Sequence, residues 1–144
     1  MATEGVPKGD GHHPVHKMYK NYELMTDNPA IFMSSFIPQF CYYLARGFQE
    51  NSYYMNSMLP DWFHADKEWW ASVLPDDANV WGAHVKDKVW GAGAGPSPTG
   101  YGVERIEGSK NLVVSPAIMA GFLPIANEEG KLLDAALQVL QCSG

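Results

Sequence analysis

One stretch of the chain, residues 28–48 (NPAIFMSSFIPQFCYYLARGF), contains the longest run without a charged residue. Residues typical of helix ends flank this run. Asn28 is a favourable N-cap residue, and Gly47 suits the position just after a helix end. Pro38 would remove one backbone hydrogen bond and kink a helix near its middle. The stretch therefore predicts one kinked hydrophobic helix over residues 28–48.

The environment of this helix has two interpretations. A membrane span needs about 20 predominantly apolar residues. The uncharged run falls just short of that length, and it contains Ser34, Ser35 and Gln39. Tyr42 and Tyr43 near its end would suit the interfacial region of a membrane. A single membrane span and a buried core helix of a soluble domain both remain open.

The composition favours a chain whose surface is covered. Only 18% of residues are charged, against about 25% in a typical soluble domain, while 12% are aromatic. Large aromatic side chains at a surface usually contact a partner or lipid headgroups. The net charge is -6 and the basic residues are scattered, which argues against nucleic acid as a partner. The expected partners are other protein subunits and membrane lipids.

Two further helices are predicted in the middle of the chain. Pro60 and Asp61 mark the start of a helix over residues 61–74. Its apolar residues recur with helical periodicity, and Asp66, Lys67 and Glu68 are assigned to its polar face. A third helix is predicted over residues 78–90 from the spacing of Trp81, Val85 and Val89.

The remaining segments are less regular. Residues 1–20 are expected to form an extended arm, with a short helical turn from residue 18 to residue 25, and residues 1–24 lack the features of a secretory signal or a transit peptide. Residues 91–102 (GAGAGPSPTGYG) predict an irregular linker, and residues 103–109 a short strand or turn. Residues 112–126 form a second apolar run, and residues 127–140 an amphipathic helix.

Together these features predict a mainly α, extended, non-globular small protein. Its segments would be an N-terminal arm, the hydrophobic helix, a pair of aromatic amphipathic helices, a Gly/Pro-rich linker, and an apolar segment with a terminal helix. Their bounds are residues 1–27, 28–48, 49–90, 91–110 and 111–144.

No group of residues predicts a catalytic, metal or intrinsic cofactor site. The spacing of His12, His13 and His16 matches no closed zinc site. Cys41 and Cys142 are too few for a disulfide framework. The glycines of residues 91–95 lack the spacing and the following lysine of a phosphate loop.

His64 is the one histidine with carboxylates at helical spacing. Asp61 and Glu68 would share its helix face, and a carboxylate can orient an imidazole for general-base catalysis. No serine or cysteine at a recognisable nucleophile turn accompanies it. The charged residues near His84 are Lys86, Asp87 and Lys88, which give no such arrangement.

The function expected from these features is that of a non-catalytic accessory subunit of a large membrane complex. A respiratory-chain or ATP synthase complex of the mitochondrial inner membrane is the favoured setting. Two alternatives are a compact soluble α-helical enzyme or ligand-binding domain using His64, which would be cytoplasmic, and a photosystem-associated subunit of the thylakoid membrane with lipid or pigment contacts. The expected interface anchors are large aromatic residues: Trp62, Trp69, Trp70, Trp81, Trp90, Tyr42 and Tyr43.

Overall fold

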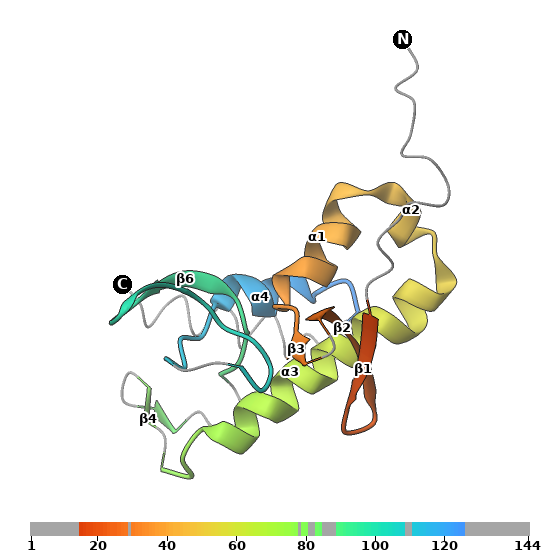
Figure 1. Cartoon of the computed structure of the whole chain (residues 1–144). Helices are drawn as coiled ribbons and strands as arrows, with labels where there is room; N and C mark the ends of the chain where they lie inside the picture. Colours follow the sequence, from red (N-terminus) through yellow and green to blue (C-terminus); the bar gives the residue numbers. More distant parts are fainter. Residues whose placement is uncertain are drawn as a thin grey trace.

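A computed structural model describes residues 15–28, 30–77, 79–80, 83–84, 89–108 and 111–125 (Figure 1). Short antiparallel strands and helices alternate along these ranges. The strands are β1 Val15–Tyr19, β2 Tyr22–Asn28, β3 Ile31–Phe32, β4 Asn79–Val80, β5 Ala83–His84, β6 Ala94–Ser97 and β7 Gly100–Val103. The helices are α1 Phe36–Leu44, α2 Arg46–Gln49, the π-helix η1 Tyr54–Met58, α3 Leu59–Val73 and α4 Pro116–Gly121. The fold is therefore mixed α/β, and the mainly α prediction is wrong.

The predicted hydrophobic helix over residues 28–48 is divided among several elements. Asn28 ends β2 instead of capping a helix, and β3 pairs back onto β2. Helix α1 begins only at Phe36, so Pro38 lies in its first turn, where a proline breaks no intrahelical hydrogen bond. The predicted kink is therefore wrong, and the single long helix that either interpretation required does not form. In the described ranges, no helix has the length and apolar character needed to cross a membrane.

Residues 15–28, the described part of the region predicted as an arm and helical turn, instead form a β-hairpin, and residues 1–14 of that arm lie outside the described residues. Strands β1 and β2 pair from Val15↔Thr26 to Tyr19↔Tyr22. Lys20 in the connecting turn has a φ of 50°, which suits a tight two-residue connection. The hairpin buries one face, so cross-strand pairing outweighs the weak helical signal of the local sequence.

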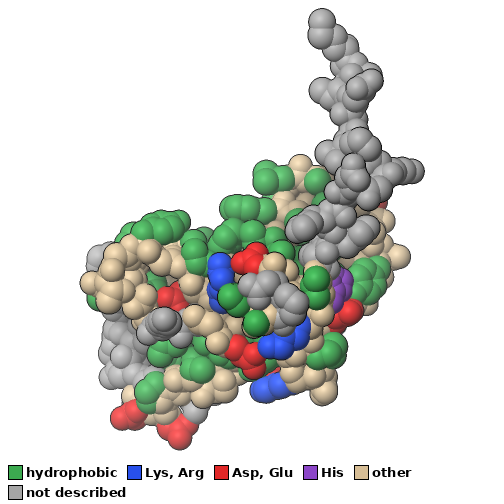
Figure 2. Space-filling model, viewed as in Figure 1, with side chains coloured by type: hydrophobic (Ala, Val, Ile, Leu, Met, Phe, Trp, Pro, Cys, Tyr) green, Lys and Arg blue, Asp and Glu red, His purple; other side chains and the backbone are tan. Residues whose placement is uncertain are grey.

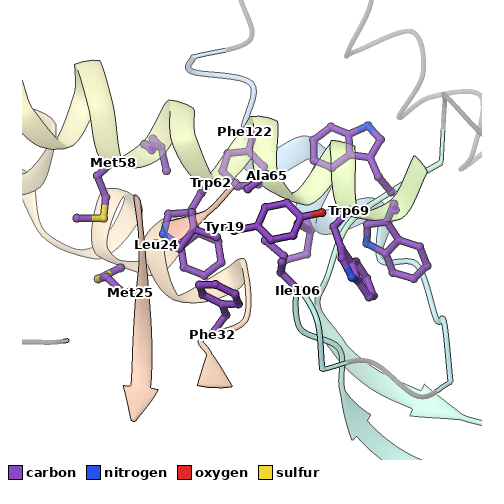
Figure 3. Close-up of a cluster of buried hydrophobic side chains, with 14 of the residues drawn as sticks. Tyr19, Leu24, Met25, Phe32, Met58, Trp62, Ala65, Trp69, Ile106 and Phe122 are labelled. Carbon is purple, nitrogen blue, oxygen red and sulfur yellow. The ribbon is translucent and has the colours of Figure 1, made fainter. Parts of the chain in front are cut away.

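Helix α3 confirms the prediction for residues 61–74 within the uncertainty of helix ends. It is the longest described helix, and its buried face packs on the three-stranded sheet of β1, β2 and β3 (Figure 1). Trp62 lies among Leu24 and Phe32 of that sheet (Figure 3). Aromatic side chains dominate this core because each buries a large apolar area.

The helix predicted over residues 78–90 is wrong where the chain is described. Strands β4 and β5 pair antiparallel, with Asn79 opposite His84 and Val80 opposite Ala83. Asn, Val and Gly are weak helix formers, so the helical spacing of the apolar residues is not sufficient to make this segment a helix. Trp81 and residues 85–88 lie outside the described residues.

The predicted linker over residues 91–102 is also wrong. Residues 89–93 are buried, and β6 and β7 form a hairpin with Gly95 opposite Gly102. Gly91 has a φ of +125°, and a Cβ at this position would lie 2.5 Å from the backbone oxygen of Ser115. Glycine therefore permits a close approach of two backbones, instead of providing a loose connection.

The described segments pack on one another instead of extending. One cluster of buried hydrophobic residues draws members from Tyr19 in β1 to Phe122 after α4 (Figure 3). The apolar run over residues 112–126 contributes α4 to this core. The amphipathic helix predicted over residues 127–140 lies outside the described residues.

Candidate interaction site

A fully buried carboxylate, Asp66, stands at the centre of the structure. Its side chain is 0% exposed. It accepts hydrogen bonds from the Ser35 hydroxyl, from the Gly91 amide at 3.2 Å and from the Ala92 amide at 3.0 Å. A buried carboxylate is tolerated when several donors face it, as they do here.

The position of Asp66 on α3 corrects the prediction from sequence. The sequence predicts Asp66 on the polar face of that helix, together with Lys67 and Glu68. Trp62, Asp66 and Trp70 are spaced by four residues and share one buried face. The spacing itself was the signal that could have identified Asp66 as a core residue.

Burial has the largest effect on the pKa of Asp66. Desolvation raises the pKa of the Asp66 carboxyl to about 6 from its ordinary value of 3.8. The hydrogen bonds from Ser35, Ala92 and Gly91 act in the opposite direction, because they favour the charged form.

The hydrogen bonds around Asp66 position three neighbouring elements. Ser34 donates from its hydroxyl to the Ala92 carbonyl at 2.7 Å, which fixes the start of α1. The Ser115 amide donates to the Gly91 carbonyl at 3.0 Å, which fixes the start of α4. The Glu104 amide donates to the Gly93 carbonyl at 2.7 Å, which fixes the end of the β6–β7 hairpin. The segment of residues 91–93 thus joins α1, α4 and the hairpin to the buried carboxylate.

These three elements enclose a cleft of about 450 Å³. In Figure 1, α4 lies between α1 and the β6–β7 hairpin. Aromatic and small side chains line the cleft, and none of the described lining residues is charged. They are Phe36, Gln39, Phe40, Tyr43, Ala94, Tyr101, Ser115, Ala117, Ile118 and Gly121.

Gln39 is the most deeply buried polar side chain of the cleft, with 5% of its surface exposed. Its Nε2 donates to the Ile118 carbonyl at 2.7 Å. Because the amide nitrogen must face that carbonyl, the orientation of the side chain is fixed and Oε1 points away from it. A Cβ at Gly121 would collide with Oε1, so glycine is required for this contact between α1 and α4. No described residue donates a hydrogen bond to Oε1.

Large apolar side chains surround the cleft at the surface. Phe40 is 54% exposed, Tyr43 51%, Leu44 80% and Tyr101 77%. We call these four residues the apolar face. Figure 2 shows hydrophobic side chains gathered over α1 and over the β6–β7 hairpin. The first three lie at helical spacing on the outer side of α1, so they form one continuous stripe there.

The aromatic residues predicted as interface anchors fall into two groups. Trp62, Trp69, Trp70 and Trp90 are buried within the core of the chain itself. Tyr42 is partly buried and packs edge-on against exposed Tyr43, with ring centroids 4.9 Å apart. Contact with another protein stays a prediction, and the structure leaves surface for it on the tyrosines.

The acids near His64 have other partners. Glu68 accepts hydrogen bonds from the Tyr22 hydroxyl and from Lys20 Nζ, the latter at 2.9 Å. Asp61 accepts from the Glu23 amide at 3.0 Å. Between described residues, no hydrogen bond joins His64 to either acid. These contacts instead attach the β1–β2 hairpin to α3.

His64 itself contacts aromatic rings. It stacks on Tyr22, with ring centroids 6.0 Å apart and the ring planes inclined by 17°. His16 lies elsewhere, with its Nδ1 3.3 Å from a Glu23 carboxylate oxygen. His12 and His13 lie outside the described residues, and the described part of the chain contains no cluster of metal-ligating side chains.

The chain matches no protein-family model, no curated protein sequence and no solved structure.

Proposed function

We propose that the chain is a non-catalytic subunit of a larger protein assembly, and that it contacts its partner through the apolar face. The observation that supports this proposal is the exposure of the apolar face, because each of its four large side chains is more than half exposed. Three are aromatic, and aromatic residues are enriched at protein interfaces.

The energetics favour covering this surface. Removing a Phe or Leu side chain completely from water contributes about 1.5–3 kcal/mol. Isolated apolar side chains are normal on protein surfaces, but a contiguous group around a cleft marks an interaction site. The hydrogen bonds that join α1 and α4 to Asp66 through residues 91–93 would keep the apolar face ordered before binding. This order reduces the conformational entropy lost on association.

The low charge content favours an energy-transducing membrane complex as the setting. A respiratory complex or ATP synthase of the mitochondrial inner membrane is the form of this proposal that we favour, with a thylakoid complex as the alternative. In either setting, the chain would also contact membrane lipids or pigment.

The native mass of the endogenous protein tests the proposal. The protein would be solubilised gently from its source and detected by antibody after native electrophoresis. Migration at several times the 15.9 kDa of the chain, together with other polypeptides, is expected. Migration at about 15.9 kDa would overturn the proposal.

The alternative of a soluble enzyme using His64 receives no support from the described contacts. The hydrogen bonds of Asp61 and Glu68 go to the β1–β2 hairpin, and the imidazole stacks on Tyr22. Nothing in this arrangement orients the imidazole toward a reacting group.

A further inference from the structure

We propose that the cleft between α1, α4 and the β6–β7 hairpin receives one uncharged aromatic side chain that carries an N–H or O–H donor, a Trp or Tyr of the partner subunit. This inference rests on the proposed function, because it names what the partner inserts at the centre of the contact.

The charge of the cleft selects the occupant. None of the described residues that line it is charged, so a carboxylate or ammonium group entering it would lose hydration without gaining a counterion. The occupant is therefore neutral.

The size and shape of the cleft favour a ring. Its volume of about 450 Å³ lies within the usual range of binding clefts, about 300–1,000 Å³. Phe36 and Phe40 line one wall with ring centroids 5.3 Å apart, and Tyr101 contributes a third ring from the hairpin. Aromatic walls pack well against an inserted aromatic ring in offset or edge-on geometry.

Gln39 explains the requirement for a donor. Its amide nitrogen is fixed on the Ile118 carbonyl, and its Oε1 accepts no hydrogen bond from a described residue. An apolar group that covered this oxygen would leave an acceptor without a donor, which is unfavourable. An indole N–H or a phenol O–H would satisfy it.

Continuity with the apolar face identifies a protein as the source. Phe40, Tyr43 and Tyr101 line the cleft and also project from the surface around it. A diffusible ligand filling the cleft would leave this surrounding surface uncovered, whereas a partner subunit would cover both. A central aromatic anchor with an apolar surround is the usual organisation of such contacts.

Three small probes test the cleft with the purified full chain. Indole has the ring and the donor, 1-methylindole lacks the donor, and indole-3-acetate adds a charge. We expect saturable binding of indole, with shifts of the Gln39 side-chain amide in NMR spectra. We also expect about fivefold weaker binding of 1-methylindole, since one neutral hydrogen bond is lost, and weaker binding still of indole-3-acetate. Absence of saturable indole binding, or equal affinity for all three probes, would overturn the proposal.

Ala117→Trp provides a variant that fills the cleft, because Ala117 is exposed and lines it. Met18→Trp places the same side chain at an exposed position of β1 as the matched control. Indole should bind the control as it binds the wild type and should not bind Ala117→Trp. If Ala117→Trp unfolds at lower denaturant than the control, Tyr101→Ala replaces it, since a side chain that is 77% exposed contributes little to the core.

The same variants in the native assembly separate the two proposals. We expect about tenfold less of the Ala117→Trp chain in the assembly than of the Met18→Trp chain. Equal incorporation of the two variants would overturn the cleft proposal and leave the proposed function standing. Failure of the wild type itself to migrate with an assembly would overturn the proposed function.

Discussion

At the scale of single residues, the buried carboxylate of Asp66 determines how the chain is held together. It accepts hydrogen bonds from Ser35, just before α1, and from the segment of residues 91–92, and it lies on the core face of α3. Removal of an acceptor that serves several buried donors costs more than the hydrogen bonds themselves, because the donors remain without partners.

Asp66→Ala should lower the free energy of unfolding by about 3 kcal/mol, because it leaves the Ser35 hydroxyl and two amides unsatisfied. Urea unfolding followed by tryptophan fluorescence measures the change. Asp77→Ala, at an exposed position, is the control and should change stability by less than about 0.5 kcal/mol. Equal stability of the two variants would contradict the role of Asp66.

The raised pKa of Asp66 also predicts a dependence of stability on pH. Between about pH 4 and pH 6 the folded chain retains a proton on Asp66 that the unfolded chain releases. The contribution of this group to stability is therefore fully present at low pH and decreases as pH rises toward 6, by up to about 3 kcal/mol.

Comparison of the wild type with Asp66→Asn isolates this effect, because the other carboxylates are common to both. The stability difference between the two proteins should change with pH from 4 to 6 and become constant above 6. A difference that is constant from pH 4 to pH 8 would show that Asp66 titrates normally.

Single residues such as Asp66 and Gln39 were hard to predict for a physical reason. A charged or amide side chain is usually exposed, so sequence reasoning placed Asp66 on the polar face. Its burial depends on donors from Ser35 and Ala92, which are distant in sequence and reach it only after folding.

At the scale of elements, α3 could be predicted and the β-hairpins could not. The start signals and the apolar period of α3 are local, so they appear in the sequence. Strands β1, β2 and β3 depend on pairing between segments, and their local propensity is weak. The sequence of the β6–β7 hairpin is rich in Gly and Pro, which usually indicate a linker.

Gly91 tests whether this segment is a fixed part of the core. Gly91→Ala should destabilise the chain by about 3 kcal/mol, because φ is +125° and the Ser115 oxygen lies 2.5 Å from the new Cβ. Gly47→Ala in α2 is the matched control, since no atom lies within 4 Å of its Cβ position. The control should be neutral or stabilising by about 0.5–1 kcal/mol. Thermal unfolding should show a lower melting temperature for Gly91→Ala and an unchanged or higher one for Gly47→Ala, and similar shifts of the two variants would indicate a loose linker.

At the scale of the whole molecule, the aromatic residues serve two purposes. Four of the five tryptophans are buried and build the core, whereas Phe40, Tyr43 and Tyr101 remain at the surface. The prediction of an extended chain was wrong because it assigned the tryptophans to contacts with partners, whereas Trp62, Trp69, Trp70 and Trp90 pack in the core of the chain itself. Pattern alone does not separate an aromatic residue of the core from one of an interface, because both are apolar and occur at helical spacing.

The proposed function requires the apolar face to attach this chain to a larger assembly. The most direct measurement compares the native mass of two double variants expressed in the source cells. Phe40→Ser with Leu44→Ser alters the face, and Val15→Ser with Met18→Ser alters comparably exposed apolar residues of β1. We predict that the β1 variant migrates with the assembly and that the face variant migrates at about 15.9 kDa, folded and soluble. Comigration of both variants with the assembly would contradict the attachment of the chain through the apolar face.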